Sequence, residues 1–336
     1  MGKLEVLFLG QHEVISVLNM KEVISEIEKV FEGHGKGSVV LPNPVKSLLA
    51  LEPTINGHFV AMPAYLDLER GAAAGVKWIS TFPDNPKRHG LTTSSAIVIL
   101  NDPRTGIPVS LMEASLITAY RTGAAAAVGA LYLANKDSRV LGLIGASFQG
   151  RYQLLALAEV FDLKECKVYD IDENAAATYK SEMERQLPSI KVHICKSYEE
   201  AVEESEIVVI ATASLTPAPF FEGRWWKKGV LLISITAKSE LKPEVLDKAD
   251  KIVVDTIDGC MHQGALYPYF KSGRLKEKDI YSEIGQIVVG KKNGRERGDE
   301  FILYVPIGVG TEDIAVAKRI YEIAKQKGWG TMLSLI

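Results

Sequence analysis

The sequence predicts an α/β protein with two domains: an α+β domain, and a doubly wound parallel-sheet domain. Three observations support this prediction. The chain has 336 residues, more than one hydrophobic core usually supports. Its first ~135 residues show short strand patterns broken by turn residues. The following ~175 residues alternate strand and helix patterns.

The first part begins with a predicted helix over residues 11–34, because apolar residues recur there on one helical face. These residues are Val23, Ile24, Ile27, Val30 and Phe31. Strands are predicted over residues 46–51, 58–62, 75–82, 95–100 and 109–112. The turn sequence of residues 102–108 predicts a hairpin between the last two strands. This part is therefore expected to be a mostly antiparallel sheet with helices.

A long helix is predicted over residues 114–134, with an unusual run of small side chains. Seven of the eight residues from Gly123 to Ala130 are Gly or Ala. Such a surface permits close approach of another backbone, which favours tight helix packing. Close approach of a flat ligand is the alternative.

The second part alternates strands and helices after Asp137. Strands are predicted over residues 140–144, 167–169, 191–195, 207–212, 230–235 and 252–255. Helices are predicted over residues 150–160, 173–186 and 243–249, and residues 310–328 form a last amphipathic helix. The strands are continuous apolar runs, which is typical of a parallel sheet covered on both faces.

A glycine-containing turn connects the first of these strands to a helix, within residues 140–150. The usual Gly-x-Gly-x-x-Gly pattern becomes Gly-x-Ser-x-x-Gly, formed by Gly145, Ser147 and Gly150. Small residues let the backbone approach a pyrophosphate, and a helix N-terminus offers free N–H groups. A plain strand-to-helix turn is the alternative. A nucleophile elbow requires Gly-x-Ser-x-Gly, and Gln149 occupies the position of its second glycine, so the hydrolase alternative fails.

An acidic residue follows the next strand and supports dinucleotide binding. Asp170 lies 25 residues after Gly145, where a carboxylate is expected to bind both ribose hydroxyls of NAD. Its alternative role is a helix cap, for which Asp172 and Asn174 are better placed. We therefore expect NAD rather than NADP, because Asp170 would repel a 2′-phosphate.

Composition excludes several classes of protein. The net charge of -3 gives no electrostatic signature of nucleic-acid binding, and no uninterrupted apolar run approaches the ~18 residues of a membrane span. The N-terminal residues lack a signal-peptide core. Three separated cysteines fit a reducing cytosol, and no His or Cys spacing predicts a metal site. We expect a cytoplasmic protein without a metal.

Taken together, the motifs resemble those of the ornithine cyclodeaminase/mu-crystallin family over nearly the whole chain. The matching segments are residues 62–63, 75–77, 91–93, 105–108, 117–124, 144–149 and 312–315. The resemblance implies a Rossmann-type NAD-binding domain, residues 121–310, inserted into a substrate-binding and dimerisation domain, residues 1–120 plus 311–336. It also implies a homodimer. The family includes cyclodeaminases, alanine dehydrogenases, ketimine reductases, opine-type synthases and a hormone-binding crystallin.

The resemblance also implies roles for individual residues. Lys77 and Arg121 match the pair that holds the substrate carboxylate, and Arg121 also lies where the cofactor phosphates pass. Lys46 stands at or beside the family's carboxylate-binding arginine, and Val309 matches a residue that lines the substrate site. The residues matched to the cofactor are Thr93, Gly145, Ser147, Phe148, Gln149, Gly150, Asp170, Thr212 and Ala213.

Three departures from the family pattern concern the chemistry. Residues 233–241 form a shortened loop that lacks the family's catalytic Asp, and residues 308–313 are about two residues short. Val60 precedes Ala61 and Met62, where cyclodeaminases have a glutamate before Met-Pro. An efficient ornithine cyclodeaminase needs repeated proton removal, so the loss of both carboxylates argues against that activity.

The sequence thus predicts an NAD-dependent oxidoreductase acting on the C–N bond of a small amino or imino acid, like an alanine dehydrogenase or a ketimine reductase. Lys77 is the candidate for proton transfer. The alternatives are an ornithine cyclodeaminase and a crystallin-like protein that binds NAD(P)H and a small ligand.

Overall fold

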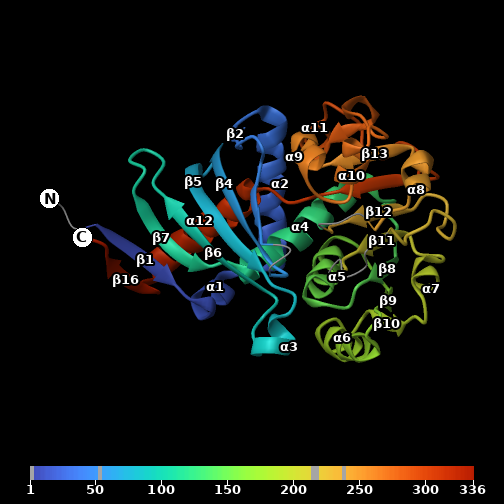
Figure 1. Cartoon of the computed structure of the whole chain (residues 1–336), viewed down its shortest axis with the longest axis horizontal. Helices are drawn as coiled ribbons and strands as arrows, with labels where there is room; N and C mark the ends of the chain where they lie inside the picture. Colours follow the sequence, from blue (N-terminus) through green and yellow to red (C-terminus); the bar gives the residue numbers. More distant parts are fainter. Residues whose placement is uncertain (1–3, 52–54, 213–218, 237–239) are drawn as a thin grey trace. The chain divides into compact units, whose positions relative to one another are not determined.

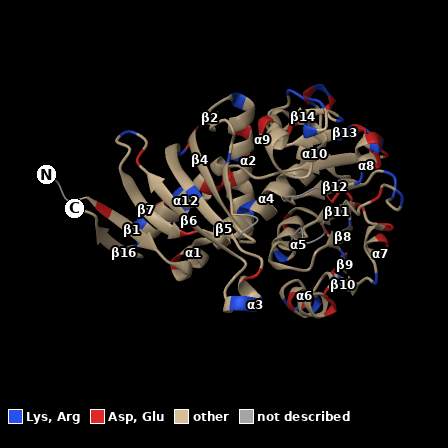
Figure 2. Ribbon diagram, viewed as in Figure 1, with Lys and Arg blue, Asp and Glu red and all other residues tan. Residues whose placement is uncertain are grey.

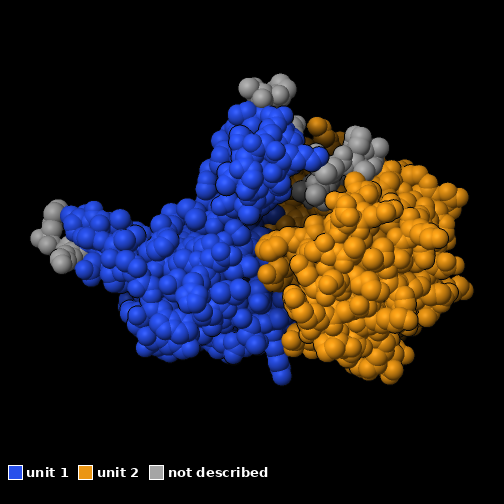
Figure 3. Space-filling model, turned by 90° about the horizontal axis from the view of Figure 1, so that it is seen from below, with its two compact units in different colours: residues 1–121, 309–336 blue, residues 122–308 orange. Residues whose placement is uncertain are grey.

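The computed structural model describes residues 4–51, 55–212, 219–236 and 240–336 (Figure 1). The chain divides into two compact units, coloured separately in Figure 3. Unit 1 consists of Met1–Arg121 and Val309–Ile336, and unit 2 consists of Thr122–Gly308. Arg121, Val309 and Gly310 fall in unit 1, whereas the sequence-based division assigned them to the NAD-binding domain.

Unit 1 is built on an eight-stranded sheet with the order β16-β1-β7-β6-β5-β4-β2, in which β3 also pairs with β4. Its strands are β1 (Glu5–Leu9), β2 (Val39–Val40), β3 (Ser47–Ala50), β4 (His58–Leu68), β5 (Gly71–Thr81), β6 (Ser94–Asn101), β7 (Pro108–Glu113) and β16 (Thr331–Ser334). Every pairing is antiparallel except that of β1 with β7. The predicted antiparallel sheet is confirmed.

Two of the predicted strands are too short. The strand predicted over residues 58–62 continues through Pro63 to Leu68, and the next strand begins at Gly71 instead of residue 75. A proline inside a strand pattern usually marks an edge, because proline has no N–H to donate. Here β3 pairs with residues 58–61 of β4 and β2 with residues 65–66, so Pro63 lies in the gap between these partners.

The helix predicted over residues 11–34 is two helices, α1 (Gln11–Val17) and α2 (Met20–Lys36). The side chain of Asn19 accepts a hydrogen bond from the N–H of Glu22 at 3.1 Å and starts α2 as an N-cap. Unit 1 also contains α3 (Asn85–His89) and α12 (Gly310–Lys327). Helix α12 packs on β4, β5 and α2 and covers the inner face of the sheet.

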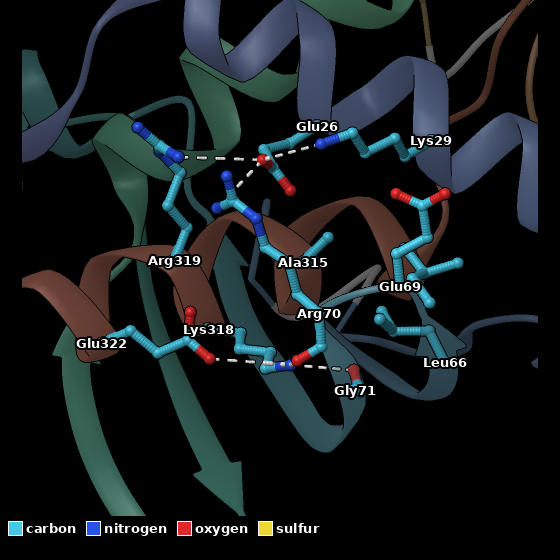
Figure 4. A pocket seen from close by; sticks show the side chains of 11 residues that line it. Glu26, Lys29, Leu66, Glu69, Arg70, Gly71, Ala315, Lys318, Arg319 and Glu322 are labelled. Carbon is cyan, nitrogen blue, oxygen red and sulfur yellow. Dashed lines mark hydrogen bonds and ion pairs between the residues drawn. The ribbon is translucent and has the colours of Figure 1, made fainter.

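A buried carboxylate links α2 to α12 and to the β4–β5 turn (Figure 4). Glu26 lies within ion-pair distance of Arg70 at 3.2 Å and of Lys29 and Arg319 at 3.7 Å each. These groups line a shallow hollow between the two helices and the turn. Through these ion pairs Glu26 connects α2 to Arg319 on α12 and to Arg70 in the β4–β5 turn.

Unit 2 is an eight-stranded, wholly parallel sheet with the order β10-β9-β8-β11-β12-β15-β13-β14. Its strands are β8 (Val140–Ile144), β9 (Glu165–Tyr169), β10 (Lys191–Ile194), β11 (Ile207–Ile210), β12 (Leu231–Ser234), β13 (Lys251–Val254), β14 (Ser282–Glu283) and β15 (Ile302–Val305). The predicted parallel sheet is confirmed. Two of its strands, β14 and β15, were not predicted.

Helices connect the strands of unit 2, as in a Rossmann-type fold. They are α5 (Phe148–Val160), α6 (Glu173–Gln186), α7 (Tyr198–Val202), α8 (Pro243–Lys248), α9 (Ile257–His262), α10 (Tyr267–Lys271), a 3-10 turn (Glu277–Asp279) and α11 (Ile284–Val288). The bounds of α6 coincide with the predicted helix over residues 173–186.

Helix α4 (Ser115–Leu133) carries the run of small residues. A Cβ added at Gly123 would lie 2.4 Å from the carbonyl oxygen of Tyr152, and one at Gly129 would lie 2.1 Å from the ring of Tyr304. The prediction of tight packing is confirmed. By length and composition α4 could cross a membrane, but 78% of its apolar window is buried inside the protein. We interpret it as a core helix.

Acidic and basic residues are interspersed along both units, as Figure 2 shows. Alternating signs on helices such as α6 fit the small net charge of -3.

Candidate active site

The centre of the candidate site in unit 1 is a buried lysine. Side chains alternate between the two faces of a strand, and this alternation directs Lys77 of β5 to the inner face, under α12. Lys77 is 1% exposed, and its Nζ donates a hydrogen bond to Oδ1 of Asp313 at 2.8 Å. Burial, and then the neighbouring charge of Arg121, lower the pKa of Lys77 to about 7, although Asp313 opposes the change.

Arg121 shares the same aspartate. It lies on α4, is 6% exposed, and donates through Nε to Oδ1 of Asp313 at 3.1 Å. Its Nη1 donates to Oε2 of Glu312 at 3.0 Å. Glu312 and Asp313 are fully buried in the first turn of α12, where the helix dipole favours negative charge. Burial raises the pKa of Glu312, although Arg121 opposes this.

The cluster contains one more cation than it has carboxylates. Lys46 is close enough to influence the pKa values of Lys77 and Glu312. When all groups are ionised, the three cations exceed the two carboxylates by one charge. Arginine has five N–H donors, and among the described residues Arg121 donates one to Asp313 and one to Glu312. The cluster can therefore accept the carboxylate of a small substrate.

Of the other two residues predicted in unit 1, Val309 contacts the cluster and Thr93 lies away from it. Val309 is fully buried and precedes the first turn of α12, and its N–H donates to Oε1 of Glu312 at 3.3 Å. Thr93 precedes β6, five residues before Val98, which pairs with Lys77. That spacing places Thr93 roughly 17 Å from the pair along the strand.

Sequence reasoning assigned no role to Glu312 or Asp313, and it missed His34. Nε2 of His34 lies 2.8 Å from Oγ1 of Thr311, immediately before the two acids. Burial lowers the pKa of His34 to about 4, so the imidazole is neutral at pH 7. The family segment 312–315 contained both acids, but nothing in the sequence joined them to Lys77.

The glycine turn of unit 2 fits a phosphate-bearing cofactor. Gly145 has φ +110°, and a Cβ there would lie 2.6 Å from the carbonyl oxygen of Ala211. A Cβ on Gly150 would lie 2.2 Å from the carbonyl oxygen of Gly145. Ser147 is the exposed N-cap of α5, and its side chain makes no capping bond. The turn therefore leaves the first N–H groups of the thirteen-residue α5 available to an anion.

Asp170 follows β9 and lies beside this turn. Its Oδ2 accepts a hydrogen bond from the N–H of Ala146 at 2.7 Å, and its Oδ1 accepts one from the N–H of Asp172 at 2.9 Å. Each carboxylate oxygen has a second lone pair, so both can still accept ribose hydroxyls. Phe148 is 48% exposed, whereas Oε1 of Gln149 is buried without a hydrogen-bond partner among the described residues.

The remaining residues predicted to contact the cofactor, Thr212 and Ala213, follow β11. The hydroxyl of Thr212 donates to Oε1 of Glu240 at 2.8 Å, and Thr236 donates to the other carboxylate oxygen. Glu240 is 2% exposed. Ala213 and residues 237–239 of the shortened loop lie outside the described residues.

A Rossmann-type sheet with a phosphate-binding turn, together with a buried cluster of cations and carboxylates, defines a dinucleotide-dependent enzyme class. The chain matches the ornithine cyclodeaminase/mu-crystallin family over residues 5–328 and belongs to that family. The resemblance seen in the sequence is thus confirmed.

Three relatives are close over nearly their whole length. The chain is 36% identical to alanine dehydrogenase of Archaeoglobus fulgidus, over 98% of each chain. Among solved structures, Δ1-pyrroline-2-carboxylate reductase of Thermococcus litoralis with NADH and L-proline is 37% identical, with a TM-score of 0.91 and coverage of 97% of this chain and 99% of that one. An archaeal alanine dehydrogenase dimer with bound NAD is 36% identical, with a TM-score of 0.90 and coverage of 99% and 100%.

Proposed function

We propose that the protein is an NAD-dependent oxidoreductase that acts on the C–N bond of a small amino or imino acid. This proposal rests mainly on the environment of Lys77. It is a buried lysine with a pKa of about 7, and it lies beside two further cations. Such a group can exchange a proton with a substrate nitrogen at neutral pH. The glycine turn supports the cofactor, and the relatives named for alanine and pyrroline-2-carboxylate support the substrate class.

The cluster in unit 1 would hold the substrate. Arg121 and Lys46 bind its carboxylate, and Lys77 exchanges a proton with its nitrogen. In unit 2, Gly145, Ser147 and Gly150 would hold the pyrophosphate of NAD and Asp170 its ribose. When bound, NAD accepts or returns the hydride of the substrate α-carbon. The residues of this chain fix the substrate and supply the proton.

The two alternatives differ in what they require. Cyclodeamination needs repeated proton removal, and Val60 is a buried apolar side chain on the inner face of β4, where the family's glutamate would stand. We therefore expect ornithine to be a poor substrate. A crystallin-like binder would retain NADH affinity without turnover.

The test is a screen of NADH oxidation with pyruvate plus ammonia and with Δ1-pyrroline-2-carboxylate, and of NAD reduction with L-alanine and L-proline. We expect turnover with at least one of these, lowered about 10²–10⁴-fold in Lys77→Met. Lys87→Met, on the exposed face of α3, is the matched control and should keep full activity. NADH binding without turnover of any substrate would favour the binder, and rapid proline formation from ornithine would favour the cyclodeaminase.

The proposal extends to assembly and location. The outer face of the unit 1 sheet exposes Trp78 and Ile97, which lie opposite each other on β5 and β6. An apolar patch on an antiparallel sheet needs a cover, and the archaeal relative is a dimer, so we propose a homodimer through this face. All three cysteines are free and buried, which supports a reducing cytoplasm.

A further inference from the structure

We propose that Asp313 is the positioning residue of the proton transfer: it holds the ammonium of Lys77 in place and keeps it in the protonated form that imine reduction needs. This inference rests on the proposed function and deepens it. The family's loop carboxylate is missing from this sequence, and Asp313 is the acid that the fold places against the candidate proton donor.

The geometry of Asp313 supports this role. Its Oδ1 accepts hydrogen bonds from Lys77 at 2.8 Å and from Arg121 at 3.1 Å. Its Oδ2 is buried without a hydrogen-bond partner among the described residues. One oxygen thus fixes both cations, and the other remains able to receive an N–H group of a ligand.

The charges around Lys77 explain why an aspartate is needed. Arg121 approaches from α4 and Lys46 from the segment before β3, and both disfavour a further positive charge. Asp313 on α12 opposes them, whereas its neighbour Glu312 contacts Arg121. Without the charge of Asp313, burial and the two cations would lower the pKa of Lys77 further.

In imine reduction, Lys77 gives one proton to the substrate nitrogen and becomes neutral. The α-carbon then gains the hydride of NADH, and the π-electron pair of the C=N bond becomes the lone pair of the product amine. One imine, one NADH and one proton thus give one amine and one NAD⁺, and Lys77 regains its proton from solvent. Asp313 acts only by holding Lys77 through its Oδ1.

The experiment compares the pH dependence of kcat/KM for imine reduction in the wild type, Asp313→Asn and Glu312→Gln. In the wild type, kcat/KM should fall as the pH rises through about 7, because Lys77 loses its proton. In Asp313→Asn the same fall should occur about 1–3 pH units lower, because a stabilising charge is gone. In Glu312→Gln the midpoint should stay in place while KM rises.

An equal loss of activity at every pH in Asp313→Asn, with the midpoint unmoved, would overturn the inference, because that is the signature of a merely structural role. Should Asp313→Asn fail to fold, Asp313→Glu retains the charge. It should keep the wild-type midpoint with a lower kcat, and a shifted midpoint would contradict the inference.

A second measurement does not depend on turnover. The Nζ resonance of Lys77 in the ligand-free protein, assigned by its loss in Lys77→Arg, should titrate at lower pH in Asp313→Asn than in the wild type. If no substrate turns over but this shift is present, the proposed function fails and the role of Asp313 in setting the charge of Lys77 stands. If a substrate turns over but the shift is absent, the proposed function stands and the role of Asp313 fails.

Discussion

At the scale of single residues, the sequence pointed to the cations of the candidate site and not to the acids that bind them. Lys77 and Arg121 belong to family segments, so both could be named in advance. Their shared partner, Asp313, is 236 residues from Lys77 along the chain. Only the packing of α12 under the sheet brings these groups together, and a strand pattern does not specify which helix covers it.

We propose that the choice between NAD and NADP also depends on a single residue, Asp170. Because its carboxylate would repel a 2′-phosphate, we expect kcat/KM with NADH to exceed that with NADPH by at least about tenfold. Asp170→Asn keeps the shape and the acceptor oxygen but removes the charge, so it should reduce this preference. The measurement is kcat/KM with each cofactor.

Asp172→Asn is the control for that prediction. Asp172 caps α6 by accepting hydrogen bonds from the N–H groups of Asn174 and Ala175, so its change concerns the helix and not the ribose. The ratio of NADH to NADPH activity should therefore be unchanged. A wild type that prefers NADPH would contradict the role given to Asp170.

At the scale of elements, the glycine turn gives a sharp prediction. A Cβ on Gly150 would meet the backbone oxygen of Gly145, which cannot move without opening the turn. Gly150→Ala should therefore weaken NADH binding at least about tenfold, as measured by fluorescence titration, and lower the melting temperature.

Gly298→Ala is the matched change within unit 2. Its added Cβ would meet the side-chain oxygen of Asn135 at 3.7 Å, an ordinary contact, and its φ is not in the left-handed region. Cofactor affinity should stay at the wild-type value. Equal losses in both variants would show that the turn has no particular part in binding.

The elements that were predicted well are those with strong periodicity, and the misses have physical causes. The helix over residues 173–186 and the buried strands of unit 2 follow from apolar patterns and a good cap. The break at Asn19 was missed because the apolar residues that predicted the helix all lie in α2, whereas α1 buries only Val14. Strand β16 is fully exposed, so it has no pattern of burial to detect.

At the scale of the whole molecule, the prediction concerns assembly. Charged residues on the outer face of the unit 1 sheet should prevent the proposed dimer, because two like charges would be buried there. We expect sedimentation at micromolar concentration to give a dimer for the wild type and a monomer for the double variant Trp78→Glu, Ile97→Glu.

Ile171→Glu provides the control, because Ile171 is 74% exposed and lies in unit 2. It should remain a dimer. A wild-type protein that sediments only as a monomer would disprove the assembly, as would a dimer that persists in the double variant.

The alternation of side chains along β5 limits which insertions and deletions the chain can tolerate. Lys77 points to the inner face and Trp78 to the outer face because neighbouring residues of a strand alternate in direction. Deleting one residue upstream within β5 would shift this alternation, bring the indole inside and turn the ammonium outward. The proposed proton transfer and the proposed subunit association would fail together, although each can be altered separately by substitution. We therefore expect β5 to accept new side chains on its outer face far more readily than any insertion or deletion.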